Sequence, residues 1–132
     1  MEKLEYRLNI LKSSNVIDDE IYEKLIKLLN YLRNDWNIIL TEDNGSMLIT
    51  HLSMALKRIK EGENVNKIDE EVYNDALKSD KLEEVKKIYN GIVENVFIED
   101  LPEEEKKYIY VNLLLIKENL YRKVEGGILW KL

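Results

Sequence analysis

The 132-residue chain has no cysteine, one histidine and one proline. Without cysteine the chain has no disulfide, no thiolate metal site and no thiol nucleophile. A tetrahedral zinc site would have a single imidazole to draw on, so we expect neither a metal nor another cofactor. A chain of this length buries roughly two thirds of its unfolded surface on folding. We therefore expect one domain that folds without a covalent or metal staple.

Long apolar runs and concentrated basic surface are also missing. No run approaches the roughly 20 apolar residues of a membrane span, and the charged start, Met1–Arg7, lacks the apolar stretch of a signal peptide. The net charge is −6 and the pI is 5.0. The small basic group Lys57–Lys60 is followed at once by acidic residues. Nucleic-acid affinity depends on phosphate contacts with basic surface, so we expect a cytoplasmic protein that binds neither nucleic acid directly nor a membrane.

Helical periodicity runs through the chain, and no segment alternates long enough for a sheet. The apolar spacing predicts helices near residues 2–13, 18–36, 41–62, 69–78, 80–96 and 102–120. The fold class is therefore all-α, a compact bundle of five to six amphipathic helices. We assign residues 1–125 to a single helical domain. Residues 126–132 form a short apolar tail, which we expect to dock because exposed apolar groups favour burial.

Polar residues at the predicted helix starts indicate caps. Asp18 or Ser14 can cap the second predicted helix, and Thr41 or Asn44 can cap the helix that carries the histidine. Asp80, with Glu83 three residues later, is typical of a capping box. In the short helix after residue 69 we expect Val72 to point inward. The run Val96–Ile98 is either a β-like segment or a link between helices.

The single histidine, His51, lies in an amphipathic helix that a glycine can end at Gly62. Leu48, Leu52, Ala55 and Ile59 form its core stripe, and His51 lies on the neighbouring strip with Met47, Met54 and Arg58. A neutral imidazole keeps a free nitrogen lone pair at cellular pH, which can accept a phosphoryl group. The alternative is a structural or surface histidine. Because an edge position buries little, we expect His51→Ala to cost on the order of 1 kcal/mol.

Two other features have functional and structural interpretations. Glu103–Glu105 follow Pro102 and could form a catalytic acid cluster, but acidic residues also stabilise the positive end of a helix, which we favour. Asn112 places an amide on the apolar side of the last helix, where it could join helices by hydrogen bonds. We find no sign of an enzyme active site: glycine-rich phosphate loops and nucleophile elbows are missing.

Two segments resemble one family. The pattern His51-Leu-x-x-Ala-Leu-x-Arg58-Ile-x-x-Gly62, followed by Asn64 and Asn66, resembles the first phosphohistidine helix of the PTS regulation domain (PRD). The pattern Leu101-Pro-x-x-Glu105-x-x-Tyr108-Ile-x-x-Asn112 resembles the family's second segment, in which a second phosphorylated histidine stands where this chain has Asn112. The resemblance covers about residues 10–120 and implies an all-α bundle.

The resemblance implies a bacterial module regulated by the sugar phosphotransferase system. HPr or an enzyme IIB component would phosphorylate His51, with Arg58 as an electrostatic neighbour, while Asn112 could not accept a phosphoryl group. As a free-standing single PRD, the chain would act through another regulatory protein and form a homodimer, to which an exposed strip of Met47 and Met54 could contribute. The alternative is a structural helical dimer or adaptor of PRD ancestry that is no longer phosphorylated.

Overall fold

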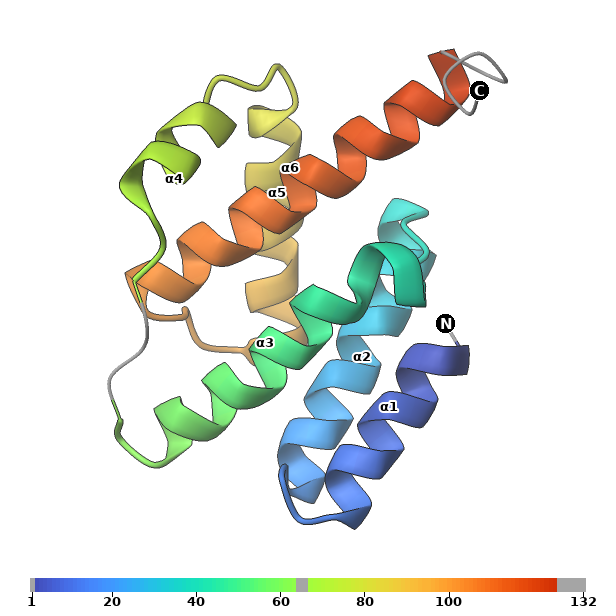
Figure 1. The fold of residues 1–132 in the computed structure, drawn as a ribbon, viewed down its shortest axis with the longest axis vertical. Helices are drawn as coiled ribbons and strands as arrows, with labels where there is room; N and C mark the ends of the chain where they lie inside the picture. Colours follow the sequence, from blue (N-terminus) through green and yellow to red (C-terminus); the bar gives the residue numbers. More distant parts are fainter. Residues whose placement is uncertain (1, 64–66, 126–132) are drawn as a thin grey trace.

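A computed structural model describes residues 2–63 and 67–125, with side chains described through residue 118. These segments contain helices and no strands (Figure 1), which confirms the predicted all-α class. The helices are α1 (Glu2–Ser13), α2 (Asp19–Trp36), α3 (Glu42–Lys60), α4 (Glu70–Ala76), α5 (Leu82–Ile92), a π-helical turn η1 (Val93–Phe97) and α6 (Glu103–Glu125).

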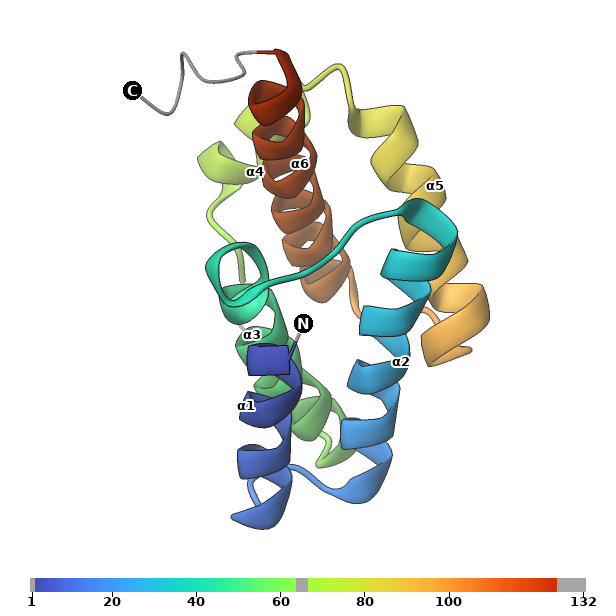
Figure 2. The same ribbon diagram turned by 90° about the vertical axis from the view of Figure 1, so that its right-hand side faces the viewer.

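The helices pack in two groups that share one core. The helices α1, α2 and α3 contact one another, while α6 packs against α4 and α5. Contacts of α2 with α5 and η1, and of α3 with α6, join the two groups. In Figures 1 and 2, α3 and α6 lie next to each other, and α1 covers the other flank of α3. This placement puts the histidine-bearing helix between α1 and α6.

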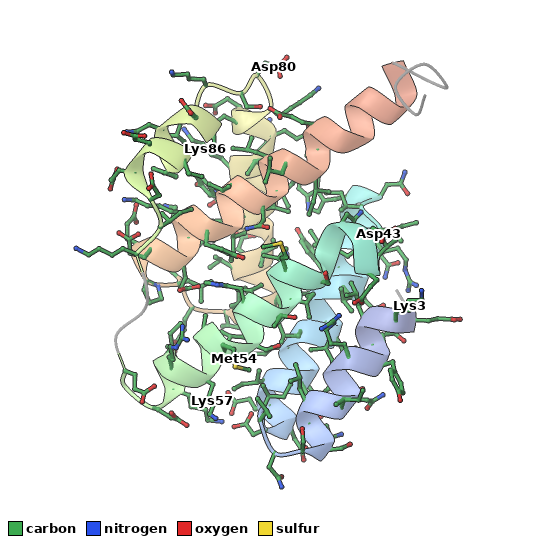
Figure 3. All side chains as sticks on the ribbon, viewed as in Figure 1. Lys3, Asp43, Met54, Lys57, Asp80 and Lys86 are labelled. Atoms are coloured by element: carbon green, nitrogen blue, oxygen red, sulfur yellow. The ribbon has the colours of Figure 1, made fainter. Side chains whose placement is uncertain are left out.

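A single apolar cluster joins all the helices except α4 through fully buried side chains. On α3, the predicted stripe is buried at Leu48, Leu52 and Ala55, while Ile59 is partly exposed. Charged side chains such as Lys3 and Asp80 project away from the helices into solvent (Figure 3). Among the described residues, no helix is both long and apolar enough to cross a membrane.

The caps of α2 and α3 form where the sequence placed them. Thr41 is the N-cap of α3: its hydroxyl accepts a hydrogen bond from the Asn44 amide, and the Asn44 side chain accepts one from the Thr41 N–H at 2.7 Å. At α2, the Asp18 carboxylate accepts from the Ile21 N–H at 2.8 Å. After α3, Gly62 adopts a positive φ of 73°, a conformation that glycine tolerates without strain.

The predicted capping box at Asp80 and Glu83 is wrong. The N-cap of α5 is Lys81, and no side chain caps this helix end. Ser79 instead organises the turn, because its hydroxyl accepts from the Lys81 N–H and its carbonyl accepts from the Leu82 N–H. This local turn delays the start of the helix beyond Asp80.

Two burial predictions also fail. Val72 is 50% exposed, because the short helix α4 lies on the outside of α6 and buries none of its residues completely. Met54 is partly buried against the core, so the predicted exposed methionine strip reduces to Met47, which is 75% exposed. The apolar tail 126–132 lies outside the described residues.

The segment after α5 is the π-helical turn η1. The Ile98 N–H donates to the Val93 carbonyl at 2.7 Å, and Ile98 then takes a positive φ of 70°. The turn buries Val96 and Phe97. The run Val96–Ile98 is therefore a helical link to the loop before α6, and not a strand.

Candidate functional site

His51 lies where α3 packs against α6, and its side chain touches a buried carboxylate. The Nε2 atom of His51 is 2.7 Å from Oε2 of Glu105, which lies in the first turn of α6. The His51 side chain is 22% exposed, whereas the Glu105 side chain is 1% exposed. The contact links residues 54 positions apart in the chain. One flank of the histidine is thus fixed by the protein while part of the ring remains accessible.

Tyr108 constrains the same imidazole from its face. The rings of His51 and Tyr108 are stacked, with centroids 3.5 Å apart and planes 15° from parallel. Glu105 and Tyr108 are three residues apart on α6, a spacing that places both on the same side of the helix. Burial raises the pKa of the Tyr108 hydroxyl above its ordinary value of 10.0. At neutral pH a protonated, uncharged phenol ring therefore covers the histidine.

The acidic triplet at the start of α6 divides into different roles. Glu104 accepts a hydrogen bond from the Ile68 N–H at 3.1 Å and lies 3.7 Å from Lys107. Glu105 points inward to His51, and its second oxygen, Oε1, is buried without a hydrogen-bond partner in the described part of the chain. A buried carboxylate is costly unless it is paired. The histidine contact, together with the helix N-terminus, offsets part of this cost.

The Glu105 contact determines which nitrogen of His51 is available. An ionised carboxylate only accepts hydrogen bonds, so this contact favours the tautomer in which the Nε2–H group donates a hydrogen bond to Oε2 of Glu105. In the neutral imidazole the lone pair then resides on Nδ1. A carboxylate partner of this kind fixes both the tautomer and the ring orientation, as it does for metal-bound histidines. In this tautomer Nδ1 is the ring nitrogen with the free lone pair.

The structure separates Arg58 from this cluster and connects Asn112 to it indirectly. Arg58 is seven residues after His51 on α3, about 10.5 Å along the helix axis, and its side chain forms no ion pair with any described residue. The Asn112 side chain donates to the main-chain carbonyl of Tyr108 at 2.9 Å. This hydrogen bond lies within α6, so the side chain of Asn112 does not join two helices as predicted but bonds one turn back, to the tyrosine that stacks on His51.

A cleft that the sequence reasoning did not anticipate opens beside His51. It has a volume of about 410 Å³ and lies between α1 and α3, lined by Arg7, Ser46, Met47, Thr50 and His51. The residues from α3 follow from its helical spacing, but nothing in the pattern of α1 singles out Arg7. Glu105 belongs to the second resembled segment, but only the fold brings it into contact with His51. In the described segments, no group of histidine and acidic side chains is arranged to hold a metal ion.

The described residues thus form a helical domain that holds one partly exposed histidine at the contact between α3 and α6. The PRD domain family matches residues 26–115, most of the chain, and the chain belongs to this family. It is therefore a PRD-family regulatory domain. It is also similar to the uncharacterized protein YhfY of Escherichia coli strain K12, with 28% identity over 110 residues that cover 83% of this chain and 91% of the relative. No solved structure matches the chain.

Proposed function

We propose that this PRD domain is a phosphorylation-responsive module that acts through protein partners in the control of genes linked to the sugar phosphotransferase system. The phosphoacceptor is His51. The observation that supports this most directly is the 2.7 Å contact between His51 Nε2 and the buried carboxylate of Glu105. The contact orients a partly exposed imidazole and directs its lone pair to Nδ1. The domain would act in the cytoplasm, where the phosphotransferase proteins operate.

The transfer involves one bond formed and one bond broken. The Nδ1 lone pair of His51 attacks the phosphorus of a phosphohistidine on the donor, either HPr or an enzyme IIB component. The new P–N bond forms as the donor's P–N bond breaks, and the donor nitrogen recovers its electron pair. The Nε2 proton of His51 stays in place, so the phosphorylated ring carries a positive charge. Glu105 stabilises this charge through its hydrogen bond with Nε2–H.

Phosphorylation would change the electrostatics at the contact between α3 and α6. A phosphoryl group adds about two negative charges and strong acceptor oxygens. It would arrive beside Glu105, which is already negative, and next to the stacked ring of Tyr108. Such local charge changes alter packing and partner binding when the surrounding contact has two arrangements. We propose that the output is a change in homodimer formation or in binding to another regulatory protein.

A second function is a structural helical dimer or adaptor of PRD ancestry that is no longer phosphorylated. Two observations favour it. Asn112 stands where the resembled motif has a second histidine, and its side chain is used in a hydrogen bond within α6. The Nε2 atom of His51 is also engaged by Glu105. In this function His51 serves the packing of α3 on α6 and carries no signal.

The deciding experiment is phosphotransfer with purified components. The domain is incubated with labelled phosphoenolpyruvate, enzyme I and HPr, with and without enzyme IIB proteins. Because His51 is the only histidine in the sequence, acid-labile label on the wild type and none on His51→Gln would support the proposal. No label with any donor, while a known acceptor in the same reaction is labelled, would favour the structural function.

A further inference from the structure

Arg7 connects α1 to α3 with part of its hydrogen-bonding capacity unused. Its Nη2 group forms an ion pair with Glu42 at the start of α3. Its Nε–H is buried and has no hydrogen-bond partner within the described residues. A buried donor without an acceptor costs about 1–3 kcal/mol. The guanidinium is therefore bound at one edge and unsatisfied at another, which favours an additional acceptor.

Two hydroxyl-bearing residues line the cleft that Arg7 shares with His51. Ser46 and Thr50 line it from α3, four residues apart and hence on one side of the helix. Neither hydroxyl has a hydrogen-bond partner in the portion of the chain that the structure describes. The cleft volume of about 410 Å³ leaves room for a small oxyanion with water around it. A guanidinium and two hydroxyls beside an imidazole form a suitable lining for phosphoryl oxygens.

We propose that this cleft is the subsite that receives the phosphoryl group carried by His51, and that Arg7 moves from Glu42 to bind it. This inference rests on phosphorylation of His51, the event that the proposed function invokes, and names the residues that respond to it. Arg7 is preferred to Arg58 because Arg7 lines the same cleft as His51, whereas Arg58 lies two helical turns away.

The exchange is electrostatically reasonable. Glu42 offers Arg7 one partly exposed negative charge, whereas a phosphoryl group offers about two charges and geometry suited to a guanidinium fork. The other charged group at the histidine is Glu105, which contacts the opposite nitrogen and does not line the cleft. Transfer of Arg7 would release the link between α1 and the first turn of α3. Phosphorylation would thereby be communicated to the surface of α1, where Tyr6 and Ile10 are exposed.

The test uses chemical phosphorylation, so that it does not depend on a protein donor. Phosphoramidate, a small phosphoryl donor, is used to modify the full chain, and the single histidine gives one phosphohistidine resonance in ³¹P NMR. The chemical shift of this resonance is followed as a function of pH. The midpoint of that titration is compared between wild type, Arg7→Gln and Arg58→Gln. A guanidinium next to the phosphoryl group lowers its pKa, so Arg7→Gln should raise the midpoint by about 0.5–1 unit. Arg58→Gln removes one positive charge from α3 and should leave the midpoint unchanged.

A further variant protects the test against misfolding of Arg7→Gln. Glu42→Gln keeps Arg7 and frees it from its partner, so the midpoint should fall below that of the wild type. Equal midpoints in all folded variants, or equal shifts from Arg7→Gln and Arg58→Gln, would overturn the subsite. Failure of phosphoramidate to modify His51 would also overturn it. If the midpoints shift as expected but no phosphotransferase protein labels the domain, the subsite stands and the proposed function fails.

Discussion

The imidazole of His51 lies face to face with the phenol ring of Tyr108, 3.5 Å between centroids and 15° from parallel. Glu105 holds the edge of the same imidazole. Both constraints come from α6, whereas the histidine comes from α3. A side chain that is held at a face and an edge loses rotational freedom before any reaction, and such preorganisation lowers the cost of positioning a nucleophile.

We expect Tyr108→Leu to loosen His51 without unfolding the domain. The substitution removes the ring contact, which is worth about 0.5–1.5 kcal/mol beyond its buried area. Tyr108→Phe is the matched control, because it keeps the stacked ring and removes only the hydroxyl. Urea unfolding measures the stability difference, and the ring-proton shifts of His51 report the stacking. Identical histidine shifts in the leucine variant and the wild type would show that the rings do not stack in solution.

The structure raises the expected cost of His51→Ala from about 1 kcal/mol to about 2–4 kcal/mol. The reason is Glu105, which is 1% exposed and would lose its partner. Glu105→Gln removes the buried charge, so His51→Ala should cost much less in that background. The measurement is a double-mutant cycle of unfolding free energies. Additive effects of the substitutions would contradict a direct interaction between His51 and Glu105.

Loss of stability in His51→Ala would therefore not argue against signalling. The relevant comparison is His51→Gln, which keeps a hydrogen-bonding group near Glu105 but cannot accept a phosphoryl group in this chemistry. A stable His51→Gln domain that no longer responds to phosphodonors would separate signalling from folding.

An ion cluster between α2 and α3 predicts a pH window for stability. The Nζ atom of Lys60 forms ion pairs with Asp18 and Glu20, and it lies 3.0 Å from Oε2 of Glu20. The Lys60 hydrogen bonds lower the pKa of Asp18 below 3.8 and that of Glu20 below 4.5, while both carboxylates raise the pKa of Lys60 above 10.5. The contribution of these two carboxylates to the stability of the fold is therefore complete above pH 4.5. It is lost as the pH falls through their lowered pKa values. The contribution of Lys60 to stability is complete below pH 10.5 and is lost as the pH rises through its raised pKa.

The test of this window is Lys60→Gln. Its loss of stability relative to the wild type should be constant between about pH 5 and pH 10 and should shrink in stronger acid. Lys78→Gln, which breaks an exposed pair with Asp75 on α4, is the control and should show little effect at any pH. A Lys60→Gln deficit that persists unchanged at the acid limit would mean that the cluster is not its source.

Gly91 on α5 leaves room for Tyr31 of α2. A Cβ atom at position 91 would lie 1.9 Å from the Tyr31 hydroxyl oxygen, which accepts a hydrogen bond from Trp36 Nε1 at 3.0 Å. Gly91→Ala must displace that hydroxyl, and we expect a loss of about 1–3 kcal/mol. In a Tyr31→Phe background the loss of stability should shrink, because the hydroxyl that the new Cβ would meet is gone. The gain in helix propensity from glycine to alanine, about 1 kcal/mol, is the same in both backgrounds. Thermal melting of the four proteins measures this, and a neutral Gly91→Ala would refute the close approach.

Met47 provides the sharpest test of a homodimer. Its side chain is 75% exposed and lines the cleft that contains His51. If this surface forms the dimer contact, Met47→Glu should convert dimers to monomers by placing a charge in an apolar contact. Val72→Glu, at an exposed apolar position on α4, is the control and should remain dimeric. Light scattering at micromolar concentration gives the mass, and a monomeric wild type would refute the dimer.

Local patterns were sufficient to predict the helices and most of their ends. The stripe of α3 and the caps at Asp18 and Thr41 depend on residues within one or two turns, and these interactions are present whatever the helix later packs against. Prediction failed where a nearby competitor existed, as at Ser79, which organises the turn that displaces the start of α5 past Asp80.

The sequence by itself determined that His51 lies on the edge of an amphipathic helix, because helical periodicity is a property of neighbouring residues. It did not determine the partners of that histidine. Glu105 is 54 positions away on α6, and Arg7 comes from α1 on the opposite flank. Which side chains meet there depends on how three helices pack around a common core, and that packing minimises exposed apolar surface over the whole chain. Only the tertiary structure could therefore turn an edge histidine into an oriented imidazole with a buried carboxylate on one side and a cleft on the other.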